Sequence, residues 1–284
     1  MPKPKRGQRE GRDDDASAAN KPYREPANLE EAVERLNQQR AVLAEQGLDA
    51  ARPRYSDAEL TEMAKRAETQ GLGDRFIVRL TERRHAGDSD NIGPVDNNGN
   101  AKYWTAPLKT VEPGDTDPRA LASLLGKDNY DPNADYSVAI VDLEKSNLRE
   151  EANTFVPTFN NMADFAKKEL SDYDPKRIDE VMNQDYAARY PEPRQAMDND
   201  GYDVNDPGDV NRFARNYLDS AAEQERFRTR AAIERKLGAN QRFMGDGRTE
   251  YLGESQTAGA LETYTFDRKL ARHKRACIPG LTEK

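Results

Sequence analysis

Cysteine is almost absent from this chain, because Cys277 is the only one among 284 residues. A single cysteine cannot form an intrachain disulfide, which fits folding in a reducing compartment. It also excludes a structural zinc site built from several thiolates. We therefore expect no bound metal and a core that depends on packing alone.

Long apolar runs are also missing. No segment approaches the roughly 20 apolar residues that a membrane-spanning helix needs, so we expect no membrane association. The N-terminus is basic but has no apolar stretch behind it, so no secretory signal peptide is recognised. We expect a cytoplasmic protein in the producing cell, and any export by a route without a cleaved signal.

Apolar and aromatic residues are scarce, at 35% and 7%, whereas charged residues make up 34% of the chain. Such a composition allows one moderate core, because apolar burial must offset the entropy of ordering the chain. The net charge is -8, yet both ends are basic. Basic tails on an acidic body leave nucleic-acid binding as a third hypothesis, but no whole-domain basic face favours it.

Helical patterns occupy both halves of the chain. Asn28 can cap a helix that ends near Gly47, and Ser56 with Glu59 forms a capping box for a second helix ending near Gly71. Further helices are predicted over 120–125, 161–170, 175–190 and 209–237.

Strand patterns lie mainly between these helices, over 75–80, 102–105, 136–143 and 155–156, and again over 242–244, 249–252 and 260–266. The sequence thus predicts an α+β fold with N-terminal helices, a small interrupted sheet and a long helix in the C-terminal half. We predict three regions: a disordered tail over 1–27, a helical region over 28–72 and an α+β domain over 73–284.

Three local patterns suggest a site but have simpler interpretations. The acidic segment 198–209 is rich in oxygen ligands, but Asp203 and Asp209 stand where a calcium-binding EF-hand has Gly and Glu. A nucleophile pair of His273 and Cys277 is conceivable, but like His85 they lie in chain that reads as exposed. Gly71 and Gly73 precede a strand instead of opening a helix, which is the wrong context for a dinucleotide fingerprint.

A sparser set of elements is more informative. An Arg-bearing strand with Arg75 and Arg79 is followed by Tyr103-Trp104-Thr105, and later by a strand that carries Glu262. In that order the elements resemble ADP-ribosyltransferase-like toxin domains. The central block, with Tyr130-Asp-Pro and Phe155-Val-Pro-Thr-Phe, is also similar in style to the toxin modules of bacterial polymorphic secretion systems.

The resemblance implies a role for each element. Arg79, or Arg75 in its place, would hold the pyrophosphate of NAD, since a guanidinium forks onto phosphate oxygens. Tyr103, Trp104 and Thr105 would contact the nicotinamide, and Glu262 would be the catalytic carboxylate that stabilises an oxocarbenium-like ribose. The chain lacks the family's Ser-Thr-Ser strand and its Glu-X-Glu or Gln-X-Glu pair, so NAD cleavage is better supported than transfer to a protein.

We therefore expect a bacterial effector or toxin that consumes NAD or transfers ADP-ribose, with an immunity protein or a host target protein as partner. The alternative is a non-enzymatic interaction protein, such as a phage or plasmid accessory component. The polar N-terminus and the long polar segment 209–237 favour that alternative.

Overall fold

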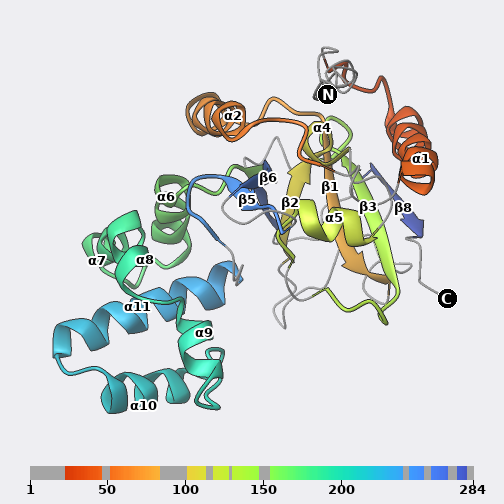
Figure 1. The fold of residues 1–284 in the computed structure, drawn as a ribbon. Helices are drawn as coiled ribbons and strands as arrows, with labels where there is room; N and C mark the ends of the chain where they lie inside the picture. The colour runs from red at the N-terminus through yellow and green to blue at the C-terminus, as the bar shows by residue number, and fades with distance from the viewer. Residues whose placement is uncertain are drawn as a thin grey trace, which may run out of the picture.

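The computed structural model describes residues 23–46, 52–83, 101–112, 118–127, 130–146, 154–238, 243–252, 257–267 and 274–279. Within these ranges the chain is α+β, as predicted (Figure 1). Of the tail predicted over 1–27, residues 1–22 lie outside the described residues. The ring of Tyr23 lies against the guanidinium groups of Arg35 and Arg54.

The centre of the fold is a six-stranded antiparallel sheet with the order β4-β7-β2-β1-β3-β8. A second, two-stranded sheet pairs β5 with β6. The strands are β1 (Phe76–Glu82), β2 (Ala101–Pro107), β3 (Tyr136–Asp142), β4 (Thr154–Phe155), β5 (Arg248–Glu250), β6 (Ala258–Leu261), β7 (Thr263–Asp267) and β8 (Lys274–Pro279).

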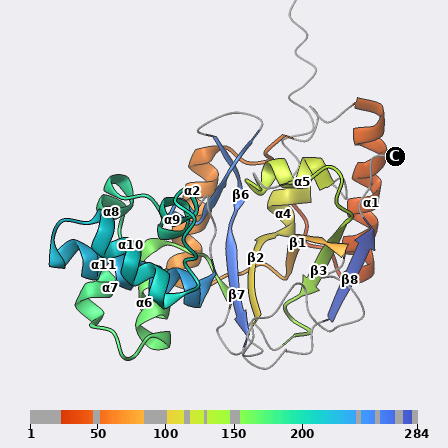
Figure 2. The same ribbon diagram turned by 90° about the horizontal axis from the view of Figure 1, so that it is seen from below.

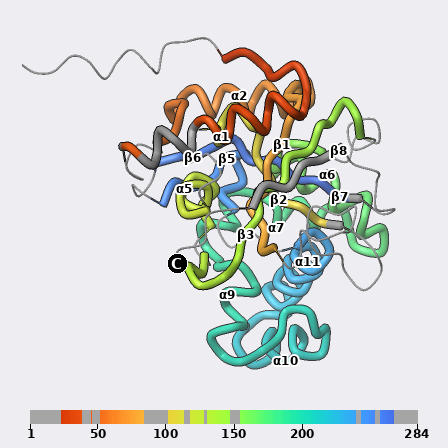
Figure 3. Tube along the Cα trace, turned by 90° about the vertical axis from the view of Figure 1, so that its right-hand side faces the viewer, coloured from red at the N-terminus to blue at the C-terminus, as the bar shows by residue number. Residues whose placement is uncertain are grey.

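Helices gather at two places around this sheet (Figures 1 and 2). On one face of the large sheet lie α1 (Leu29–Gln46), which packs on β3 and β8, α4 (Leu108–Val111), which packs on β1 and β2, and α5 (Pro118–Leu124), which packs on β1 and β3. Beyond β7 lies a helical lobe of α6 (Phe159–Glu169), α7 (Pro175–Val181), α8 (Gln184–Arg189), α9 (Pro193–Asp198), α10 (Pro207–Tyr217) and α11 (Ala221–Leu237). In Figure 3 the lobe extends away from α1 and α2 (Asp57–Gln70).

The two predicted N-caps are confirmed. Asn28 Oδ1 accepts from the Glu31 amide at 2.8 Å, and Ser56 and Glu59 form the predicted capping box. Both helices then bury an apolar side: Leu36 of α1 packs on the sheet, and Leu60 of α2 packs on β6. Both helices of the region 28–72 are therefore packed against strands, α1 in one cluster with β1 and β3 and α2 in another with β6.

Two of the predicted helices are each broken by a second cap. The segment 175–190 divides where Asn183 Oδ1 accepts from the Tyr186 amide, which starts α8. The segment 209–237 divides where Ser220 and Glu223 form a capping box at the start of α11. Apolar residues continue at helical spacing through both breaks. The sequence analysis therefore predicted one helix in each segment, where the caps begin a second helix.

Two strand predictions need correction. Phe243 and Met244 are not in a strand, although the segment 242–244 was predicted to be one. The basic end was interpreted as exposed chain, yet Lys274–Pro279 is the edge strand β8, with Val138 opposite Ile278 and Ile140 opposite Ala276. Its two charged residues are followed by four apolar ones without a period-two alternation, so the pattern did not indicate a strand.

The large sheet has one apolar face and one mixed face. Side chains such as Phe76, Val78 and Ile140 point to the first and pack under α1, α4 and α5. Ile77, Tyr103 and Ala139 point to the second, where they form a separate small cluster with Leu72. Within the described residues, no helix is long and apolar enough to cross a membrane.

Candidate functional site

The three elements that carry the sequence resemblance are neighbours in the sheet. Arg79 lies on β1, Tyr103 to Thr105 lie on β2, and Glu262 immediately precedes β7, in the order β7-β2-β1. The sequence therefore picked out three consecutive strands, although residues 79 and 262 are far apart in the chain. Not every side chain of the set points to the same face.

Arg79 is on the mixed face. It lies opposite Ala139, and its guanidinium carbon is 4.9 Å from the centroid of the Tyr103 ring. Its Nη1 is 3.5 Å from the Lys102 carbonyl oxygen. Among the described residues no carboxylate pairs with it. Burial lowers the pKa of Arg79 to about 10, so the group is still cationic at neutral pH.

Hydroxyl groups continue this face beyond Arg79. Thr105 Oγ1 lies 2.6 Å from Thr263 Oγ1, and Thr154 Oγ1 lies 3.0 Å from Thr265 Oγ1. Thr105, Thr263 and Thr265 are buried. We call Arg79, Tyr103 and these four threonines the Arg79 face. A cation above hydroxyl groups that donate and accept is suited to an oxyanion.

The threonines of β7 and β4 were missed by the sequence prediction. The signal was present in Thr263-Tyr-Thr265-Phe, where polar and aromatic residues alternate with a period of two. That alternation sends both hydroxyls to one face and both rings to the other. The sequence does not show that β7 pairs with β2, and this pairing is what places the Thr263 hydroxyl next to Thr105.

Trp104 is on the opposite face from Arg79. Its ring packs against Tyr264, with centroids 5.0 Å apart, and against Phe243 at 5.9 Å. Strand alternation explains the placement, since Tyr103 and Thr105 flank it on β2. The structure thus brings Arg79, Tyr103 and Thr105 together, and places Trp104 under the helical lobe.

Arg75 is already engaged by carboxylates. Its Nε and Nη2 contact the two oxygens of Asp142 at 3.0 and 2.8 Å, and Glu144 lies 3.2 Å from Nε. These contacts raise the pKa of Arg75. A guanidinium held by a bidentate carboxylate would have to break that pair to bind a phosphate. Arg79 is therefore the better placed of the two arginines.

Glu262 occupies the single residue between β6 and β7. Its amide donates to the Gly247 carbonyl at 2.8 Å, and the residue is only 3% exposed. It is adjacent in sequence to Thr263, which contacts Thr105 of the Arg79 face.

A polar cleft of about 340 Å³ lies elsewhere, between α2 and the helical lobe. It contains none of the residues selected from the sequence. Glu68 lies in it and accepts from Thr158 Oγ1 at 2.6 Å and from Asn160 Nδ2 at 3.1 Å. Its other lining residues include Lys65, Asn183, Gln184 and Asp246.

The acidic segment 198–209 is a set of turns. Asp209 Oδ2 accepts from the Asp203 amide at 2.9 Å, and Asp206 caps α10 through the Gly208 amide at 2.8 Å. In the described parts of the chain, no group of three or more His, Cys, Asp or Glu side chains is placed to hold a metal ion. His85 and His273 lie outside the described residues, as does the side chain of Cys277.

Comparison with known proteins adds no assignment: no protein-family model, no curated protein and no solved structure matches this chain.

Proposed function

We propose that the chain is a bacterial effector that binds NAD at the Arg79 face and cleaves it. The observation that carries the proposal is the partly buried Arg79 guanidinium, which has no carboxylate partner among the described residues and lies on the same face as the paired threonine hydroxyls. A desolvated cation gains more from an anionic ligand than an exposed one, because water screens it less. The planar, forked geometry of the guanidinium favours a ligand with phosphate oxygens.

The proposed roles follow the placement of the side chains. Arg79 binds the pyrophosphate, and Tyr103 and Thr105 contact the rest of the nucleotide from the same face. The bond between the ribose and nicotinamide breaks, nicotinamide leaves, and water or an acceptor group forms the new bond to the ribose carbon. Glu262, next to Thr263, would stabilise the positive charge that develops on the ribose. Trp104 has a packing role in this proposal.

The partners of such an effector would be an immunity protein in the producing cell and a target protein in the recipient. We propose delivery from the producer's cytoplasm without a cleaved signal peptide. The polar cleft at Glu68 is a recess that a protein partner could occupy. A purely non-enzymatic interaction protein would use that cleft and would leave the Arg79 face without a nucleotide.

Nicotinamide release and NAD binding test the proposal directly. Arg79→Gln should weaken NAD binding by on the order of 10- to 100-fold, the value of a charge-assisted contact. Glu262→Gln should abolish release while the variant still binds NAD. The matched control is Arg83→Gln, because Arg83 follows the same strand and is 60% exposed.

Two results would overturn the proposal: no binding and no turnover of NAD by the wild-type chain, or equal affinity in Arg79→Gln and wild type. Circular dichroism of each variant separates loss of binding from loss of the fold.

A further inference from the structure

Four charged side chains meet where the start of α9 packs against α11. Arg230 of α11 donates to both oxygens of Glu192, with Nε 3.2 Å from Oε2. Glu234, one turn further along α11, accepts from the Arg194 amide at 3.1 Å and lies 3.3 Å from Arg194 Nε. The side chains of Arg230 and Glu234 are 6% and 5% exposed. Two carboxylate–guanidinium contacts thus link the start of α9 to α11, with Arg230 and Glu234 on the buried side and Glu192 and Arg194 on the partly exposed side.

A small cavity of about 30 Å³ adjoins this cluster, with Trp104 of β2 in its wall. It has room for about one or two water molecules. Trp104 Nε1 is buried without a hydrogen-bond acceptor among the described residues. Glu234 Oε1 likewise accepts no hydrogen bond of good geometry, although Arg194 is near. A donor and an acceptor thus border one cavity unsatisfied, which is unusual for buried polar atoms.

Several groups act on the charge of Glu234. Burial, and then the negative charge of Glu192, raise its pKa to about 7, while the Arg194 amide, Arg194 and Arg230 oppose the rise. From α8, Tyr186 faces the same cluster, but its own pKa is raised to about 12, so it stays neutral. Glu234 is therefore the group of this junction that changes charge near neutral pH.

We propose that the junction of α9, α11 and β2 is a proton-operated switch in which Glu234 is the titrating group and Trp104 moves with it. When Glu234 is protonated, its contact with the Arg194 guanidinium is no longer an ion pair, but no negative charge has to be buried and the Arg194 amide still donates to the carboxyl group, so the helical lobe packs closely on the sheet. When it ionises, the buried negative charge requires hydration, and water enters the cavity at Trp104. This inference does not depend on NAD binding.

The sign of the effect on stability follows from linkage. The folded-state pKa of Glu234, about 7, lies above the ordinary value of 4.5, so the folded state binds more protons between these two values. Its contribution to the free energy of unfolding is complete below pH 4.5 and is lost as pH rises through 7.

Fluorescence provides the test because Trp104 is the single tryptophan of the chain. The emission of the wild-type protein should change with a midpoint near pH 7. Glu234→Gln, a neutral isostere, should hold the low-pH emission across the range. Glu225→Gln on the same helix is the control, since Glu225 is 54% exposed, and it should keep the wild-type transition.

A second variant keeps the proposal testable if Glu234→Gln does not fold. Arg194→Gln removes a cation that favours the ionised form, so the midpoint should rise by about one pH unit. A transition that persists in Glu234→Gln would overturn the proposal. So would wild-type emission that is flat from pH 5.5 to 8.5, or a midpoint that Arg194→Gln leaves in place.

Discussion

Single side chains decide how closely the small sheet approaches its neighbours. Gly259 of β6 runs against the end of α5, and a Cβ atom built on it would lie 2.1 Å from the Leu124 carbonyl oxygen. The contact is to backbone, which cannot rotate away as a side chain could. Thr249 fixes the same junction by donating to that oxygen at 2.6 Å.

Gly259→Ala should therefore lower the free energy of unfolding by about 1–3 kcal/mol, the usual cost of overpacking. Urea unfolding measures it. Gly73→Ala is the control, because nothing lies within 4 Å of its added Cβ, and it should change stability by less than about 0.5 kcal/mol. Equal effects of the two substitutions would show that β6 can move away from α5.

At the residue scale, the sequence was sufficient to predict the N-caps of helices but not the face of the sheet to which a side chain points. Ser56 and Asn28 were identified because a cap needs only residues three positions apart. Tyr103 and Trp104 were assigned to one ligand, although adjacent strand residues point to opposite faces. The threonine pairs of the Arg79 face depend on which strands are neighbours, and this information is not local.

At the scale of elements, the divided segment 209–237 shows what apolar spacing cannot reveal. Val210, Phe213 and Phe227 pack into one cluster although they belong to two helices. The chain turns at Leu218 to Ser220, and the rings of Phe213 and Phe227 then stack with centroids 5.1 Å apart. The same apolar residues would also suit one continuous helix, so the capping box is the deciding signal.

Ser220→Ala should destabilise the chain by about 1 kcal/mol, because the Glu223 amide loses its acceptor at the start of α11. Ser220→Asp should restore most of this loss, since aspartate is an equally good cap. Thermal unfolding of the two variants measures the difference. If Ser220→Asp were as unstable as Ser220→Ala, the cap would not be what begins α11.

For the whole molecule, the low apolar content predicted a single modest core, and the structure gathers distant segments around one sheet. Strands from residue 76 to residue 279 contribute to it. The position of α1 is the part that composition could not predict. It lies across β3 and β8 and is held by charges as well as by its apolar side (Figure 2).

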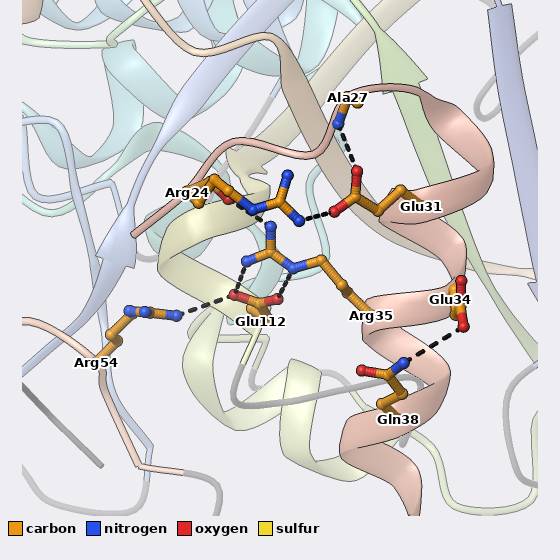
Figure 4. Close-up of polar contacts among 8 residues, drawn as sticks. All are labelled: Arg24, Ala27, Glu31, Glu34, Arg35, Gln38, Arg54 and Glu112. Carbon is orange, nitrogen blue, oxygen red and sulfur yellow. Dashed lines mark hydrogen bonds and ion pairs between the residues drawn. The ribbon is translucent and has the colours of Figure 1, made fainter. Parts of the chain in front are cut away.

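Glu112 is the centre of that attachment (Figure 4). It is 4% exposed and accepts from Arg35 of α1 at 2.8 and 3.0 Å and from Arg54 at 2.9 Å. A bidentate contact of this kind ties α1, the segment before α2 and the end of α4 together. Residues 77 positions apart in sequence are thus joined by one carboxylate.

Glu112→Gln should loosen α1 more than the rest of the fold. The amide keeps the shape but leaves two partly buried arginines without a counter-charge, at a cost of about 1–3 kcal/mol. Hydrogen exchange of the α1 amides should accelerate, while the amides of β1 and β3 should keep their protection against local opening. Glu34→Gln is the control on the same helix, because Glu34 is exposed. Unchanged exchange in α1 after Glu112→Gln would mean that apolar packing of Leu36 and Ala32 alone is sufficient to hold the helix on the sheet.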